Sequence, residues 1–102
     1  MALGSTSPFR PTGSVSVAAT TVSAASPLAG GGESVVVTNN SASVAFVRFG
    51  SDNTVSASSA DMPVLPNSRV MLSINSLIGF VATALASGSG NVFFTRGDGS
   101  FI

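Results

Sequence analysis

The sequence predicts an all-β domain, a single antiparallel β-sandwich with jelly-roll-like wiring, with a small barrel as the alternative. Three observations support this prediction. Short runs rich in β-branched and aromatic residues recur along the chain. Gly, Pro, Asn and Asp separate these runs at spacings typical of turns. Ser, Thr and Gly interrupt every Ala-containing stretch, so no amphipathic helix is predicted. A chain of 102 residues is expected to fold as one domain.

The first residues read as an extended arm. Residues 1–14 carry Pro8 and Pro11 on either side of Phe9 and Arg10. Proline fixes φ and lacks an amide donor, which disfavours both a helix and a central strand. We therefore expect an N-terminal arm over 1–14 and the β-sandwich domain over 15–102. Phe9 and Arg10 either dock on a neighbouring subunit or belong to a frayed terminus.

The expected strands follow the arm in order. Alternating or apolar runs predict strands over residues 15–22, 34–39, 44–49, 69–74, 79–85 and 91–96. Residues 54–59 read as a weak edge strand or a loop. The segment 61–67 contains Pro63 and Pro66, so it can be extended but not central. A loop is expected at 26–34, a hairpin loop at 86–90 between strands 79–85 and 91–96, and a turn at 97–100. The strands 34–39 and 44–49 also lie at hairpin distance.

Three of these strands place apolar side chains on both faces. A sandwich exposed on its outside needs only one apolar face per strand. A second apolar face must be covered by a loop, by the arm or by another chain, and we expect an intermolecular interface. The neighbouring pairs concerned are Phe46 and Val47, Phe80 and Val81, and Phe93 and Phe94.

Charge is scarce and balanced. Only 8% of residues are charged, the four arginines offset the four acids, and mean hydropathy is +0.52. Dispersed arginines form no basic stripe, so we expect no nucleic-acid partner and no anionic membrane. The longest apolar stretch, 77–86, is too short to span a bilayer, and the N-terminus lacks the features of a secretory signal. A surface with so few charges is expected to be buried in an assembly.

The residue types disfavour catalysis. The chain has no His, Cys, Tyr, Trp or Lys, which removes the usual bases, thiolates and metal-binding imidazoles. All four acids lie in or beside turn-like sequence, where capping is their ordinary role: Glu33, Asp52, Asp61 and Asp98. We expect no enzyme activity, cofactor or metal site. The tripeptide 96–98 matches an integrin-binding motif. A match of only three residues in a short turn is better explained by coincidence.

Arg48 is the charged residue placed most unusually. It lies between Val47 and Phe49 in an apolar strand, so its aliphatic stem is expected to rest on apolar surface. A partly buried arginine needs a partner, and Asp61 and Asp52 are the nearest acids in sequence. An intrachain ion pair is favoured over the alternative, an anchor between subunits.

The stretch from about 34 to 99 resembles small virion proteins of tailed bacteriophages. The resemblance lies in "VVVTNNSASVAFVRFGSD", "ADMPVLPNSRVML" and "GFVATALASGSGNVFFTRGDG". Its features are an Asn at a strand end, an aromatic-Val-Arg-Phe-Gly strand, an acid before a Pro-x-x-Pro segment, and a small-residue hairpin. Such proteins are capsid decoration (cement) proteins, compact β domains that bridge neighbouring major-capsid subunits on the outer shell.

The resemblance implies a function and a location. It implies that the chain binds the major capsid protein, stabilises the shell through repeated contacts among symmetric neighbours, and resides on the virion capsid surface, after a stay in the host cytoplasm during assembly. Two alternatives stay open: another virion part (tail, adaptor or fibre base), and a carbohydrate-binding adhesion module, which the lack of Trp and Tyr disfavours. The expected contact residues are Phe9, Arg10, Arg48, Asp61, Pro63 and Pro66.

Overall fold

Eight β-strands build the fold of this protein, known from a computed structural model that describes residues 9–75 and 77–98. These residues contain no helix, and hence none long and apolar enough to cross a membrane. The strands are β1 (Arg10–Ala19), β2 (Ala24–Pro27), β3 (Ser34–Asn40), β4 (Ala45–Gly50), β5 (Met62–Val64), β6 (Ser68–Ser73), β7 (Phe80–Leu85) and β8 (Gly90–Asp98).

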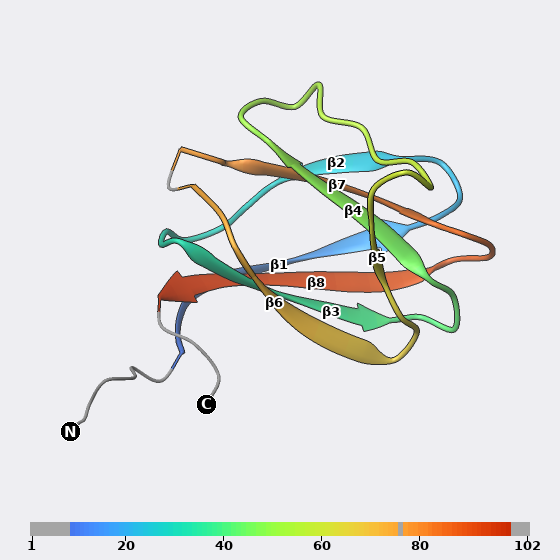
Figure 1. Cartoon of the computed structure of the whole chain (residues 1–102), viewed down its shortest axis with the longest axis horizontal. Coiled ribbons are helices and arrows are strands. Elements are labelled where there is room, and N and C mark those ends of the chain that lie inside the picture. Colours follow the sequence, from blue (N-terminus) through green and yellow to red (C-terminus); the bar gives the residue numbers. More distant parts are fainter. Residues whose placement is uncertain (1–8, 76, 99–102) are drawn as a thin grey trace.

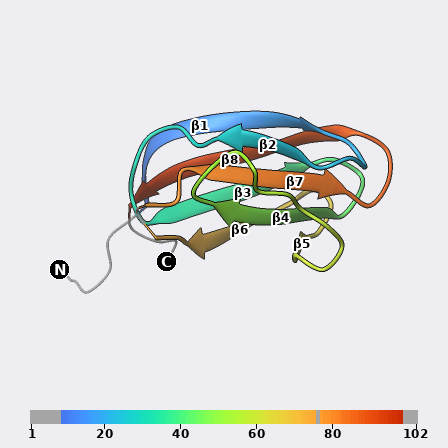
Figure 2. The same ribbon diagram turned by 90° about the horizontal axis from the view of Figure 1, so that it is seen from above.

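The strands form two antiparallel sheets of four. One sheet has the order β1-β8-β3-β6 and the other β2-β7-β4-β5, and they stack face to face (Figures 1 and 2). The pairs β1–β8, β2–β7, β3–β6 and β4–β5 are those of one long hairpin, and β3–β8 and β4–β7 are the pairs made when that hairpin rolls up. This is the jelly-roll arrangement. The all-β antiparallel sandwich predicted from the sequence is confirmed.

The core lies between the two sheets and consists mainly of valine. Alternation along each strand turns every second side chain inward, and β-branched side chains suit this pleated surface. Phe94 in β8 is fully buried and meets Phe49 of β4 edge to face, with ring centroids 6.4 Å apart. The other buried members of this core are Val17, Ala19, Val35, Val37, Ala45, Val47, Val64, Val81, Leu85 and Val92.

Part of the outer face of the second sheet is covered by this chain's own long loop, residues 51–61. Ala82 of β7 is fully buried although it points away from the main core, and it packs with Ala57 of that loop. The amide of Ala57 donates a hydrogen bond of 2.8 Å to Ser23 Oγ, which fixes the loop across the sheet. A loop of the same chain therefore covers part of the second apolar face, for which an interface with another chain was predicted.

The sandwich begins earlier in the chain than expected, inside the segment 1–14 that was predicted to be an arm. β1 begins at Arg10, and its register with β8 runs from Arg10 opposite Asp98 to Ala19 opposite Gly90. Residues 10–14 thus belong to the sandwich as part of an edge strand, a position in which proline is tolerated because its missing amide faces outward. Residues 1–8 of the expected arm lie outside the described residues.

Other local expectations were wrong. The segments 34–39 and 44–49 do not form a hairpin, because β3 and β4 lie in different sheets, and the same holds for β7 and β8. Both connections are corners between sheets, although their lengths suit hairpins. β2, with no β-branched residue, fell partly in an expected loop, and the expected turn at 97–100 begins inside β8.

Asn39 fixes one of these corners. Its side chain is fully buried, and its Nδ2 lies 2.8 Å from the Ser43 carbonyl and 3.0 Å from the Val64 carbonyl. Its Oδ1 accepts hydrogen bonds from the amide and the hydroxyl of Ser41. Asn39 therefore joins β3 of the first sheet to the end of β5 in the second.

Candidate functional site

The predicted contact residues fall into two groups at opposite ends of the domain. Arg10 lies at the start of β1, at the end of the molecule where β8 ends (Figures 1 and 2). Phe9 precedes it and is half-buried, whereas Arg10 is exposed. The remaining four residues lie in or around β4 and β5, toward the other end. The structure therefore does not bring the six together as one surface.

Arg48 and Asp61 form the ion pair expected within the chain. Arg48 Nη1 lies 3.6 Å from Asp61 Oδ1, on the outer face of the second sheet. The Arg48 side chain is 62% exposed, whereas Asp61 is 13% exposed and also accepts a hydrogen bond from the Ser58 amide. An exposed pair of this kind contributes about 0–1 kcal/mol to stability. Its role here is to orient the end of loop 51–61 as it enters β5.

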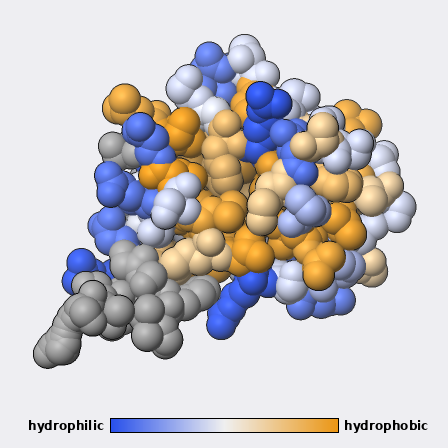
Figure 3. Space-filling model, viewed as in Figure 1, coloured by the Kyte–Doolittle hydropathy of each residue, from blue (hydrophilic) through white to orange (hydrophobic). Residues whose placement is uncertain are grey.

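The segment that follows, residues 62–66, exposes apolar side chains; we call it the β5 segment. Met62 is 44% exposed and Leu65 is 65% exposed, while Val64 between them is fully buried. Pro63 and Pro66 are exposed as well. Figure 3 shows apolar side chains gathered on this face of the molecule along β6 and around the turn from β5. This is a contiguous apolar surface at the edge of the sandwich.

Arg96 was predicted to be the last residue of a strand, with no structural role assigned to its side chain. It is 4% exposed, and its guanidinium donates hydrogen bonds to the carbonyls of Gly32 (3.0 Å) and Ile78 (2.5 Å). Arg96 thereby ties the loop after β2 to the loop before β7. A buried arginine cannot present the 96–98 tripeptide to a receptor, so the integrin-type interpretation has no support in the geometry.

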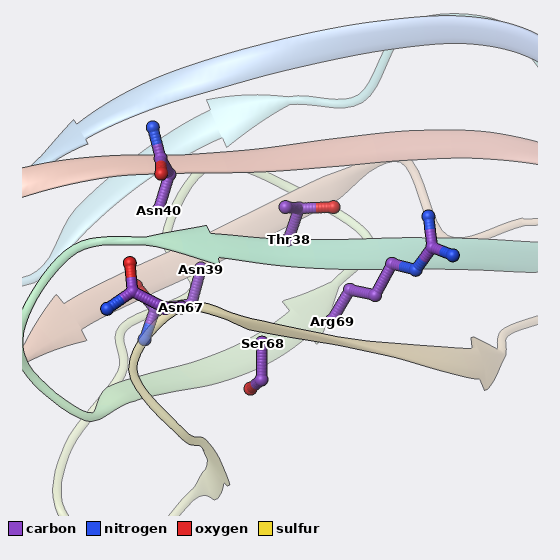
Figure 4. Close-up of a pocket in the computed structure, with 6 residues that line it drawn as sticks. All are labelled: Thr38, Asn39, Asn40, Asn67, Ser68 and Arg69. Atoms are coloured by element: carbon purple, nitrogen blue, oxygen red, sulfur yellow. The ribbon is translucent and has the colours of Figure 1, made fainter.

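A shallow pocket of about 280 Å³ opens where β3 and β6 part. The β3–β6 ladder ends at Asn39 opposite Ser68, whereas β3 continues beside β8 for one more residue, Asn40. Asn67 adopts a left-handed conformation (φ 54°) that turns the chain away from β3 and leaves the space beside Asn40 open. The lining residues are Thr38, Asn39, Asn40, Asn67, Ser68 and Arg69 (Figure 4).

All six residues that line the pocket are of polar types, and Arg69 carries a positive charge. In Figure 4, Thr38, Asn40 and Arg69 project to one side of the strand pair and Ser68 to the other, as strand alternation requires. None of the six lining residues is acidic. This pocket was not predicted, because Asn39 and Asn40 indicated only a strand end followed by a turn.

One acidic side chain of the loop 51–61 has a shifted pKa. Hydrogen bonds from the Thr54 hydroxyl and amide lower the pKa of Asp52, as in an ordinary capped turn. Within residues 9–75 and 77–98, no three His, Cys, Asp or Glu side chains gather where they could hold a metal ion.

Comparison of the chain with protein-family models, with curated proteins and with solved structures found no match.

Proposed function

We propose that this chain is a capsid decoration (cement) protein, which binds the outer surface of a bacteriophage shell and bridges neighbouring major-capsid subunits. The proposal rests on the sequence resemblance to small virion proteins. Its main structural support is the β5 segment, which exposes Met62 and Leu65 on a molecule with only eight charged residues. Apolar surface with so little charge around it is typical of a protein-binding site.

The β5 segment is suited to contact through side chains. β5 is the edge strand of its sheet, and an edge strand can recruit another strand through its unpaired amides and carbonyls. Pro63 has no amide, and β5 is only three residues long, so backbone pairing with a partner is disfavoured. Met62 and Leu65 are then free to insert into apolar depressions of a capsid subunit, with Arg48 and Asp61 beside them as polar rim.

Shell stabilisation follows from repetition. Each contact can be weak because symmetry repeats it across the shell, and two contacts on one domain bridge two subunits. The second contact in this proposal is the start of the chain around Phe9 and Arg10, at the opposite end from β5 (Figure 1). This spacing allows one molecule to reach two neighbours.

The test is co-sedimentation of the purified chain with empty capsids of the virus that encodes it. Replacing both Met62 and Leu65 by serine should leave the fold intact, because exposed substitutions change stability by about 0.5 kcal/mol or less. Binding should be lost. The matched control replaces two other exposed apolar residues, Val22 (72% exposed) and Leu77 (82% exposed), by serine and should retain binding.

A test of the contact at the start of the chain needs a deletion that is shorter than the expected arm of residues 1–14. Because β1 begins at Arg10, removing residues 2–13 would damage the sandwich itself, whereas removing 2–8 spares β1. We expect the 2–8 deletion combined with Arg10→Gln to weaken capsid binding, because Arg10 is an exposed residue of the second contact, while the far-ultraviolet circular dichroism spectrum stays the same. Undiminished binding by the Met62 and Leu65 double variant would refute the β5 contact, and undiminished binding by the combined variant would refute the second contact.

A further inference from the structure

We propose that the free edge of β1 pairs with β1 of a second copy of this chain, so that two sandwiches form a dimer with one continuous sheet. β1 and β2 are the edge strands along one long side of the sandwich (Figure 2). The proposal is independent of the capsid function, because residues 14–19 of β1 belong to neither proposed capsid contact and the dimer is measured on the free protein.

The four edge strands of the two sheets differ in how well they are protected from pairing with another chain. β5 has three residues including Pro63, and β2 has four residues including Pro27. β6 carries the charged side chain of Arg69. Short length, proline and charge are features that keep natural sheet edges from pairing. β1 is ten residues long, and beyond Pro11 near its start it has none of these features.

Residues 14–19 are the open part of this edge. They follow the irregularity between Pro11 and Gly13 and keep a regular register with β8. In the described part of the chain, their backbone pairs with β8 alone. An antiparallel ladder uses the amide and carbonyl of every second residue, so alternate residues of this stretch direct these groups away from β8. Such groups can bind the edge of another strand.

This stretch is complementary to a second copy of itself. In an antiparallel pair centred on a two-fold axis at Ser16, Val15 lies opposite Val17 of the second copy, on the inner face. Val15 is half-buried in the single chain, so the second copy covers apolar surface that is otherwise exposed. On the outer face, Ser16 lies opposite its own counterpart and Ser14 lies opposite Ala18 of the second copy. Opposed β-branched pairs and opposed serines stabilise a sheet.

Neither charge nor bulk opposes this approach. No charged residue occurs between Arg10 and Glu33, so the paired edges place no like charges opposite each other. The net charge of the chain is zero, which removes long-range repulsion between copies. β2, which lies on the same side of the sandwich, has the sequence Ala-Ala-Ser-Pro and presents no large side chain to the second copy.

Symmetry limits the assembly to two copies. A two-fold pair uses the same edge in both chains and leaves no further open edge of this kind. The edges at β2, β5 and β6 are protected, so the sheet does not grow beyond the dimer. A contact made by one pair of strands belongs to the small class of interfaces, below about 1,200 Å². We therefore expect a dissociation constant of about 10–100 μM.

The experiment is sedimentation velocity of the full chain over a concentration series from about 1 to 500 μM, which spans the expected dissociation constant. We expect a monomer at the low end, a dimer at the high end and no larger species. A chain that stays monomeric over the whole series overturns the proposal.

Charge variants at the two-fold axis identify the edge. Ser16 is exposed, so Ser16→Lys and Ser16→Glu should each fold like the parent chain. Each variant places two like charges opposite each other in the dimer, which should weaken dimerisation about ten-fold or more. An equimolar mixture of the two variants should dimerise again, because lysine then lies opposite glutamate. This rescue also shows that both variants are folded.

The matched control is Ser73→Lys, which adds the same charge at an exposed position of β6, on the opposite edge of the same sheet. It should dimerise like the parent chain. The proposal is overturned if Ser16→Lys dimerises as tightly as the parent chain, or if the mixture of Ser16→Lys and Ser16→Glu dimerises no better than either variant alone. It is also overturned if Ser73→Lys weakens the dimer as much as Ser16→Lys does.

Discussion

Replacing Asn39 by alanine should remove a large part of the stability of this domain. Asn39 is 0% exposed and connects three chain segments: its own strand, the corner at Ser41 to Ser43, and the end of β5. Alanine removes every one of these hydrogen bonds and leaves the Val64 carbonyl and the Ser41 amide without the partner that they had in the interior.

The magnitude follows from these two groups. A buried polar group left unsatisfied costs about 1–3 kcal/mol, and the carbonyls of Ser43 and Leu65 lose a partner in partly buried positions. The sum is about 3–5 kcal/mol, against a total of about 5–15 kcal/mol expected for a chain of this length. The Ser41 hydroxyl keeps its bond to the Ser43 carbonyl, so it adds little to the loss.

The assay is urea unfolding followed by far-ultraviolet circular dichroism, since the chain has no Trp or Tyr for fluorescence. A loss of this size lowers the midpoint by about 2 M urea or more. Asn40→Ala is the matched control: it deletes the same side chain from an exposed position one residue away, and its effect should be about 0.5 kcal/mol or less. Equal midpoints for the two variants would refute the role given to Asn39.

Two further substitutions test the packing. In Gly97→Ala, the added methyl would overlap the Arg10 carbonyl oxygen and lie 2.9 Å from Pro11 Cα, so β1 must shift. We expect this shift to destabilise the domain by about 1–3 kcal/mol. The melting temperature should fall by about 4–8 °C for each kcal/mol. A melting temperature equal to that of the parent chain would show that the start of β1 is not held against β8 as described. The Thr83 hydroxyl is fully buried and has no hydrogen-bond partner among the described residues. Thr83→Val should therefore stabilise the domain by about 1 kcal/mol or more in the same unfolding assay. A destabilised variant would show that the hydroxyl does make a hydrogen bond.

Strands with a strong local signal could be predicted from the sequence. The run beginning at Ser34 is rich in valine and pairs on both sides, so local preference and tertiary position agree there. β2 could not be predicted, because "AASP" has no strand preference of its own. It is extended because it pairs with β7, from Ala24 opposite Thr83 to Pro27 opposite Phe80. Tertiary context decides such strands.

The assignment of strands to the two sheets also could not be predicted from the sequence. A four-residue connection suits a hairpin and a corner equally well, so loop length could not place β3 and β4 in separate sheets. The deciding contacts are long-range, such as the bond from Asn39 to the Val64 carbonyl. The same reasoning applies to Arg96, whose carbonyl partners at Gly32 and Ile78 come from distant loops that meet only in the folded chain.

The candidate sites were predicted in part. The ion pair between Arg48 and Asp61 agrees with expectation, because an arginine among apolar neighbours needs a partner. The segment with Pro63 and Pro66 also agrees, because its strand β5 lies at the edge of the sheet and not in its centre. The polar pocket depends on where one strand ends relative to another. That offset is a property of register, which no local pattern around Asn40 or Asn67 reveals.

The most direct test of the proposed function is cryo-electron microscopy of purified particles of the virus that encodes this chain. We predict density for an eight-stranded jelly roll repeated at symmetric positions over the outer surface of the head, with the β5 segment against one major-capsid subunit and the start of β1 toward its neighbour. Density confined to the tail or to a single vertex, or absence of the chain from the particle, would contradict the account.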